Sequence, residues 1–281
     1  MTSAESPRGV LHPQGAAGRF QLDTVQPSAA LAPFVAYHWR VRWDLRGQPP
    51  YEQKVLAHPN VHLVFEEPRP AVYGVDRGLF VRRLEGCGQV LGVKFHPGGF
   101  HPFWGRPVQE LADRVLPATE VFDPGSEHAG PEDARLLGVE ETGRQILALD
   151  DSAAMAALAE EFLLARLPLP DTRPDHQAVE VAAMVALATG DHTLVRVEQL
   201  AERCGVSVRT LQRLFAEYVG AGPKWVLRRA RLQEAAQRAD ARGGAVDWVV
   251  LATDLGYSDQ AHLSRDFTAV VGLPPTRYAN S

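Results

Sequence analysis

A short pattern near the C-terminus occurs twice, with each of its five positions shifted by 52 residues. The matched pairs are Leu211 and Leu263, Arg213 and Arg265, Phe215 and Phe267, Gly220 and Gly272, and Pro223 and Pro275. Upstream, an alanine and a glycine four residues apart also recur, at Ala201 and Gly205 and again at Ala252 and Gly256. One supersecondary unit repeated within about 80 residues predicts a fold that makes the same kind of contact twice.

The residues of the first copy are typical of a helix-turn-helix. Gly205 can adopt the left-handed conformation that ends a helix, and Ser207 can cap the helix that follows. On that second helix, Leu211, Leu214 and Phe215 are spaced so that they face inward together. The second helix of such a unit enters the major groove of DNA. The repeat therefore predicts two DNA contacts, and the alternative is a helical hairpin that binds nothing.

The outward faces of the two second helices provide the candidate base-reading residues. The first recognition helix is expected at 208–218 and presents Arg209, Gln212 and Arg213. The second is expected at 260–270 and presents Gln260, His262, Ser264 and Arg265, although His262 could equally be a plain surface histidine. Arginine and glutamine form bidentate hydrogen bonds with guanine and adenine edges. Asp259, a good N-cap, and Asp266 make the second helix less basic, so we expect weaker base contact there.

A helix from Lys224 to about Ala239 is expected between the two units, with Pro223 in its first turn. At 1.5 Å per residue it would be about 24 Å long and could hold the recognition helices about one DNA turn apart, roughly 34 Å. A basic stripe on this helix at i, i+4 and i+7 consists of Lys224, Arg228 and Arg231. These side chains could contact phosphates or simply face solvent.

The charge distribution agrees with a DNA-facing surface only locally. The chain has a net charge of −5, and its part from Asp175 onward has 12 Lys and Arg against 12 Asp and Glu. Between Arg203 and Arg242, however, nine basic residues face three acidic ones. A local excess of this kind is what a phosphate-facing surface requires.

The tandem units, the helix between them and two local motifs together resemble the DNA-binding domain of the AraC/XylS transcription regulators. The motifs are Leu-Ser-Arg-Asp-Phe at 263–267 and Gly-Leu-Pro-Pro-Thr-Arg-Tyr at 272–278, and the resemblance covers roughly 175–281. It implies a sequence-specific regulator, bound to double-stranded DNA in the bacterial cytoplasm, rather than an enzyme. It also implies that the outward residues of both recognition helices read adjacent major-groove segments.

The rest of the chain divides by composition, and the whole is expected to be an α+β protein of two domains. Residues 1–19 are rich in Gly, Pro, Ser and Ala and predict a flexible tail. Short β-type runs between turn residues fill about 20–125, and helical patterns follow to 167. Three prolines mark 168–174 as a linker, so the domains are expected at 20–167 and 175–281. The resemblance implies a cupin-like β-barrel in the first, for sensing a small molecule or for dimerisation.

Two groups of side chains in the predicted barrel could carry chemistry. The aromatic group could line an effector pocket or form core, and it comprises Trp39, Trp43, Phe100, Phe103 and Trp104. The imidazole group could hold a metal or be structural, and it comprises His58, His62, His96 and His101. The acidic ligand and the His-x-His spacing of metal-binding cupins are absent, so we expect no metal and no other cofactor.

Several other classes of protein are disfavoured. No apolar run approaches the roughly 18–20 residues of a membrane span, and no signal peptide is evident. Cys87 and Cys204 are far apart and are expected to be reduced thiols of a cytoplasmic protein. One alternative is a DNA-alkylation repair protein, which needs an activated thiolate, but Cys87 has no adjacent histidine and Cys204 lies at a helix end. A metal-dependent cupin enzyme fused to a DNA-binding module is another alternative.

Overall fold

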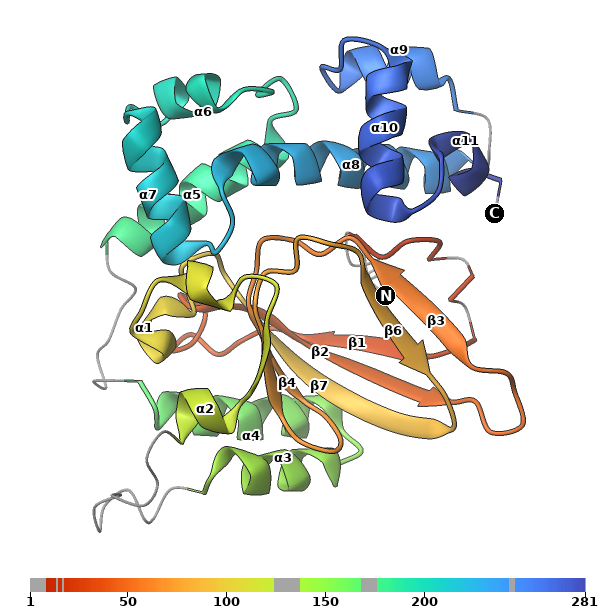
Figure 1. Cartoon of the computed structure of the whole chain (residues 1–281). Coiled ribbons are helices and arrows are strands. Elements are labelled where there is room, and N and C mark those ends of the chain that lie inside the picture. The colour runs from red at the N-terminus through yellow and green to blue at the C-terminus, as the bar shows by residue number, and fades with distance from the viewer. Residues whose placement is uncertain are drawn as a thin grey trace.

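The computed structural model describes residues 9–13, 15–16, 18–123, 137–167, 176–242 and 246–280. In these ranges a β-rich N-terminal part is followed by a C-terminal part in which every regular element is a helix (Figure 1). The α+β prediction with two structural parts is therefore confirmed. The predicted linker 168–174 lies outside the described residues.

The strands form two antiparallel sheets. They are β1 (Gln21–Val25), β2 (Val35–Asp44), β3 (Tyr51–Val55), β4 (His62–Phe65), β5 (Ala71–Tyr73), β6 (Phe80–Leu84), β7 (Cys87–Phe95) and β8 (Val115–Pro117). The larger sheet has the order β1-β2-β7-β4-β5-β8, and the smaller one pairs β3 with β6. Because side chains alternate along a strand, each face of the larger sheet has its own partner.

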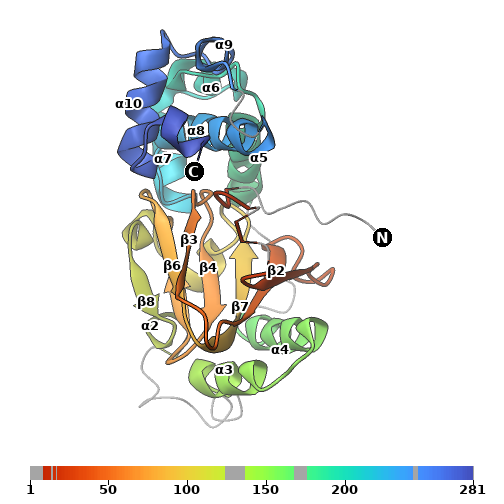
Figure 2. The same ribbon diagram turned by 90° about the vertical axis from the view of Figure 1, so that its right-hand side faces the viewer.

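One face of the larger sheet packs on helices. The helical elements of this part are α1 (His101–Trp104), η1 (Val108–Leu111), α2 (Thr119–Phe122), α3 (Val139–Leu147) and α4 (Ser152–Leu164). Leu91, Val93 and Phe95 of β7 are buried in one core with Ile146 of α3 and Phe162 of α4. Figures 1 and 2 show α3 and α4 on the side of the sheets away from the C-terminal helices.

The other face of the larger sheet looks toward β3 and β6 across a cavity. Along β7 the alternate residues Val90 and Lys94 line this cavity, as do Phe80 and Leu84 of β6. The two sheets thus enclose a pocket in the β-rich part, as a small barrel or sandwich would.

The C-terminal part is built on one long helix. Its elements are α5 (His176–Gly190), α6 (Val197–Arg203), α7 (Val208–Tyr218), α8 (Pro223–Arg242), α9 (Trp248–Asp254), α10 (Gln260–Val271) and α11 (Pro275–Tyr278). Figure 1 shows α6 and α7 at one end of α8, and α9 and α10 at the other. The helices expected at 208–218 and 260–270 are confirmed, the second with one more residue. The helix expected at 224–239 is longer, with 20 residues.

One local expectation is wrong. Part of the predicted tail is packed: Val10 bridges Val55, and Leu11 is buried at 2% exposure. Leu11 is apolar and lies in the core beneath the second helix-turn-helix, which outweighs the loose composition around it. The carboxylate of Asp151 caps α4 by accepting from the backbone N–H of Ala154.

Candidate nucleic-acid interface and ligand pocket

The two repeated units have the same packing. Gly205 and Gly256 both have positive φ, at 66° and 69°, so each turns the chain between its two helices. Phe215 and Phe267 are both 0% exposed. Their cores are separate, because Phe215 belongs to a cluster of α5 to α8 and Phe267 to a cluster of α8 to α11.

Both recognition helices begin at a side-chain cap, as predicted. The hydroxyl of Ser207 accepts from the backbone N–H of Thr210 at 3.1 Å. The carboxylate of Asp259 accepts from the backbone N–H of His262 at 2.7 Å. An N-terminal cap fixes the first turn, which is the part of a recognition helix that contacts base edges.

The predicted base-reading side chains of α7 lie together on an open face. Arg209, Gln212 and Arg213 are exposed, and within the described chain none of them forms an ion pair. The opposite, C-terminal end of α7 is held by the β-rich part. Glu217 contacts His101 at 3.0 Å between Oε1 and Nε2, and the carbonyl of Tyr218 accepts from the backbone N–H of Gly98 at 3.0 Å.

The corresponding side chains of α10 are less free. Gln260 and Arg265 are exposed, whereas His262 and Ser264 are partly buried. The ring of His262 contacts the Ser258 hydroxyl at 3.3 Å, and Arg265 Nε donates to the carbonyl of Ala261. All four side chains therefore lie on one helix, but only Gln260 and Arg265 are exposed to solvent.

Asp266 points toward α8, where its carboxylate accepts from Arg228 Nε at 3.0 Å. This contact changes the interpretation of two sequence features. The acidic charge of Asp266 is balanced inside the protein, and Arg228 is committed to that pair rather than free for phosphate.

The basic stripe expected on α8 is consequently divided. Lys224 is exposed, Arg228 pairs with Asp266, and the guanidinium of Arg231 lies 4.5 Å from the centre of the Tyr257 ring. Only Lys224 of the three thus faces solvent without an ion pair among the described residues.

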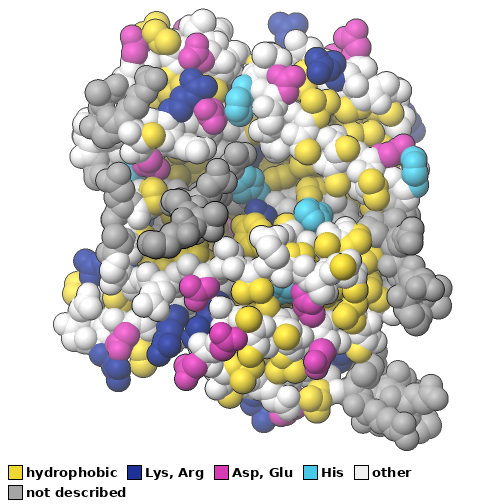
Figure 3. Space-filling view, turned by 180° about the vertical axis from the view of Figure 1, so that it is seen from behind, with side chains coloured by type: hydrophobic (Ala, Val, Ile, Leu, Met, Phe, Trp, Pro, Cys, Tyr) yellow, Lys and Arg dark blue, Asp and Glu magenta, His cyan; other side chains and the backbone are white. Residues whose placement is uncertain are grey.

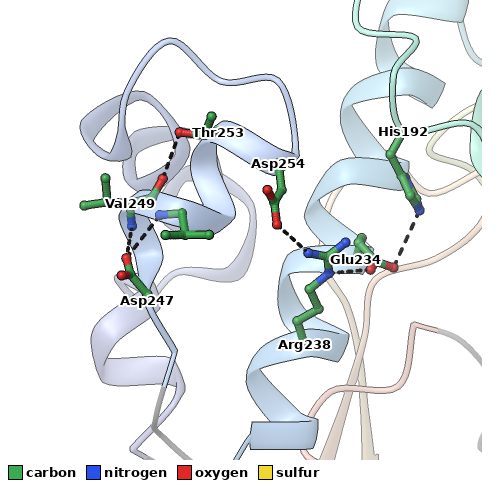
Figure 4. Close-up of polar contacts among 8 residues, drawn as sticks. His192, Glu234, Arg238, Asp247, Val249, Thr253 and Asp254 are labelled. Carbon is green, nitrogen blue, oxygen red and sulfur yellow. Dashed lines mark hydrogen bonds and ion pairs between the residues drawn. The ribbon is translucent and has the colours of Figure 1, made fainter.

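Other charged side chains of α8 form ion pairs with segments of both units (Figure 4). Arg238 bridges Glu234 of the same helix and Asp254 of α9, with N–O distances of 2.6 and 3.1 Å. Glu234 also lies 3.7 Å from His192, in the loop between α5 and α6. Many of the basic residues counted between Arg203 and Arg242 therefore form contacts within the protein.

The described residues show no large region of one charge on the face drawn in Figure 3, where Lys and Arg are interspersed with Asp and Glu.

A third set of α8 contacts reaches the β-rich part. Arg229 is buried at 2% exposure, and its Nη2 donates to the carbonyls of Arg77 and Gly78 at 2.6 and 2.7 Å. One turn further on, Gln233 donates to the carbonyl of Leu56 at 2.7 Å. The helix that joins the two recognition units thus touches the wall of the β-rich part directly. The sequence pattern did not mark Arg229 as buried, because in so basic a run a buried arginine cannot be distinguished from an exposed one.

The cavity between the sheets has a volume of about 760 Å³. Trp39 and Trp43 line it, as the aromatic group predicts, together with the apolar residues Leu22, Val64 and Phe80. Phe100, Phe103 and Trp104 pack instead in the core between the larger sheet and its helices. Arg77 and Gly78 line the cavity too, so the segment held by Arg229 is part of its wall.

The four candidate histidines have separate environments. His62 is partly buried, its Nδ1 accepts from Trp39 Nε1 at 3.2 Å, and desolvation lowers its pKa to about 3. Burial also lowers the pKa of His96, His101 pairs with Glu217, and His58 lines the cavity. The described residues contain no group of three or more His, Cys, Asp or Glu that could hold a metal ion.

The two cysteines have different environments. Cys87 is exposed at the start of β7. Burial raises the pKa of the Cys204 thiol, which disfavours the reactive form. None of the described helices combines the length and hydrophobicity that a membrane span requires.

Comparisons with known proteins agree with this division of the chain. A family described as a domain of unknown function (DUF6597) matches residues 23–117, and one described as a helix-turn-helix domain matches residues 200–281. An uncharacterized HTH-type transcriptional regulator of Haemophilus influenzae is 29% identical over 99 residues, which are 35% of this chain and 33% of that protein. The chain thus aligns with about a third of the length of this curated relative. The C-terminal domain is of the AraC type.

Solved structures of ToxT from Vibrio cholerae are also similar. One is 10% identical, with a TM-score of 0.37, and covers 93% of this chain and 98% of that one. A second, from strain O395, is 10% identical with a TM-score of 0.36, covering 92% of this chain and 96% of that one. In the AraC-type domain of this chain, α6 and α7 form the first helix-turn-helix, and α9 and α10 form the second.

Proposed function

We propose that this protein is a sequence-specific DNA-binding transcription regulator whose helices α7 and α10 occupy adjacent major-groove segments. The observation that carries the proposal is the pair of capped recognition helices at opposite ends of α8, the first with an open face of Arg209, Gln212 and Arg213. Such side chains recognise guanine and adenine edges by bidentate hydrogen bonds.

The length of α8 supports simultaneous contact by both units. Its 20 residues extend about 30 Å at 1.5 Å per residue. Successive major-groove segments on one side of DNA are roughly 34 Å apart. In this proposal α7 supplies most of the base reading and α10 contributes Gln260 and Arg265, while Lys224 contacts phosphate.

We further propose that the cavity in the β-rich part binds a small-molecule effector. A largely apolar cavity of about 760 Å³ is in the size range of ligand sites. Its wall includes Arg77 and Gly78, whose carbonyls accept from Arg229 of α8. A ligand that shifts this wall would therefore act on the helix that sets the spacing of the two recognition units.

Selection of bound sequences from random double-stranded DNA tests the DNA-binding proposal. We expect enrichment of two short motifs whose centres are about 10 base pairs apart, and an affinity that falls steeply with salt. The matched control is Arg213→Ala, which should relax the preference within one motif and leave the other unchanged. Enrichment of no sequence, or of a single motif insensitive to Arg213→Ala, would contradict the proposal.

A further inference from the structure

A row of polar side chains crosses the floor of the cavity. Tyr37, Lys94, His62 and Tyr73 are opposite one another on the neighbouring strands β2, β7, β4 and β5, and all four line the cavity. The next row of the sheet contains Trp39, Gly92 and Val64 and is apolar apart from the indole N–H. This row therefore brings an ammonium, an imidazole and two phenol hydroxyls together on the floor of the cavity, whose lining also includes polar side chains away from the row, such as Gln53 and Arg82.

Lys94 is the cation of this row, and no carboxylate within the described part of the chain balances it. Its Nζ donates to the Tyr37 hydroxyl at 3.4 Å and lies 5.1 Å from the centre of that ring. Desolvation lowers the pKa of Lys94 to about 8, and no neighbouring acid offsets this effect. An ammonium desolvated without an ion-pair partner is costly unless a ligand provides the opposite charge.

The acidic side chains that line the cavity are held elsewhere. Glu66 lies 2.8 Å from Arg82 and also accepts from the Tyr73 hydroxyl. Asp113 pairs with Arg77, and Asp76 accepts from the backbone N–H of Gly78. Among the described cations that line the cavity, Lys94 and Arg114 have no carboxylate partner, and of these two Lys94 is partly buried whereas Arg114 is exposed. Lys94 is thus the cation for which a bound anion would be the natural partner.

His62 adds a neutral donor to the same row. Its Nδ1 accepts from Trp39, and its low pKa keeps the ring neutral, so the ring proton is assigned to Nε2. One ammonium and neutral donors can balance a singly charged carboxylate, whereas a phosphate carrying two charges would be left in excess.

Two tryptophans form the apolar floor beside this row. A Cβ atom on Gly92 would lie 2.0 Å from Trp39 Cε2, and one on Gly88 would lie 2.6 Å from Trp43 Cζ2. The indoles therefore cover the sheet where glycine leaves room for them. Phe80 and Leu84 line the cavity from the second sheet. A flat apolar group fits between these surfaces.

We propose that the ligand of this cavity is an apolar molecule with a single carboxylate, which is bound by Lys94 while the apolar body lies on Trp39 and Trp43. This inference rests on the effector part of the proposed function. It names the chemical class of the ligand and the residue that selects it.

Three probes of equal shape test the inference by calorimetry on the full chain at pH 7. They are biphenyl-4-carboxylate, biphenyl-4-methanol and biphenyl-4-ylmethylammonium. The carboxylate is expected to bind at least tenfold more tightly than the alcohol, and the ammonium more weakly than both. Lys94→Met should weaken carboxylate binding at least tenfold and change alcohol binding less than threefold.

Arg114→Gln is the matched control, because Arg114 is an exposed cation at the same cavity. It should leave the preference for the carboxylate unchanged. Equal affinities of the natural chain for the carboxylate and the alcohol would overturn the inference but not the proposal that the cavity binds an effector. This comparison uses the natural chain alone and does not depend on the folding of a variant. Binding of none of the probes would overturn the inference and the effector proposal together. The DNA selection experiment is independent of both results.

Discussion

The two helix-turn-helix units are alike where they are packed and different where they are exposed. The recurring leucines and phenylalanines are fully buried, and the recurring glycines Gly220 and Gly272 have similar φ values of 86° and 81°. On the surface, α7 presents two arginines free of acidic partners, whereas α10 presents one. The repeat in the sequence thus corresponds to a shared packing scheme, and the exposed basic side chains are divided unequally between its copies.

The acidic residues of the second unit explain much of this difference. Asp259 is used as the helix cap, and Asp266 pairs with Arg228 of α8. Asp266 is therefore balanced within the protein, whereas Asp259 remains an exposed acidic group at the N-terminal end of α10. The second unit therefore presents fewer unpaired basic side chains than the first, and it keeps one exposed acidic group at the start of α10.

Truncation of the matched phenylalanines tests whether the packing is equal. Phe215→Ala and Phe267→Ala should each lower the free energy of unfolding by about 3–5 kcal/mol, because each removes a fully buried ring and leaves a cavity. Urea denaturation followed by circular dichroism measures both. Losses that differ by more than about 2 kcal/mol would show that the two cores are not equivalent.

The matched turn glycines should differ in their tolerance of a side chain. Gly205→Ala is expected to cost about 1 kcal/mol, since its φ is positive but the space around it is open. Gly256→Ala should cost about 1–3 kcal/mol more, because the new Cβ would lie 2.3 Å from Val195 Cγ1. Urea denaturation of the two variants provides the comparison. Equal costs would contradict the close contact between the second turn and the loop before α6.

A smaller effect separates two basic residues of α8. Lys224→Gln should weaken DNA binding a few-fold and reduce the slope of log affinity against log salt by about 1, as the loss of one phosphate contact requires. Arg228→Gln should leave that slope unchanged, because Arg228 is paired with Asp266. Affinity measurements between about 50 and 200 mM salt test both. A reduced slope for Arg228→Gln would show that Arg228 contacts a DNA phosphate.

Local patterns were sufficient to predict the helices of the C-terminal part. The caps at Ser207 and Asp259, the turn glycines and the buried leucines all act through neighbours a few residues away. The partners of Arg228, Arg229 and Asp266 could not be predicted in this way. Their contacts join residues 38 to 152 positions apart, and the sequence pattern marks all three simply as charged helical residues.

The β-rich part shows the same limit. Short β-type runs predicted strands in this part, and Lys94 lies in one of them, β7. The row that it forms with Tyr37 and His62 depends on the register of three strands, which only the folded chain provides. Burial of Leu11 likewise depends on the distant second unit.

The affinities of Arg213→Ala and Arg265→Ala for one selected DNA site test the inequality of the two units most directly. Arg213→Ala should cost about 1–3 kcal/mol, which is about 5- to 150-fold in affinity, and Arg265→Ala should cost less than about 1 kcal/mol. Fluorescence anisotropy at a fixed salt concentration gives both values. Equal losses, or a larger loss for Arg265→Ala, would contradict the assignment of the main base contacts to α7.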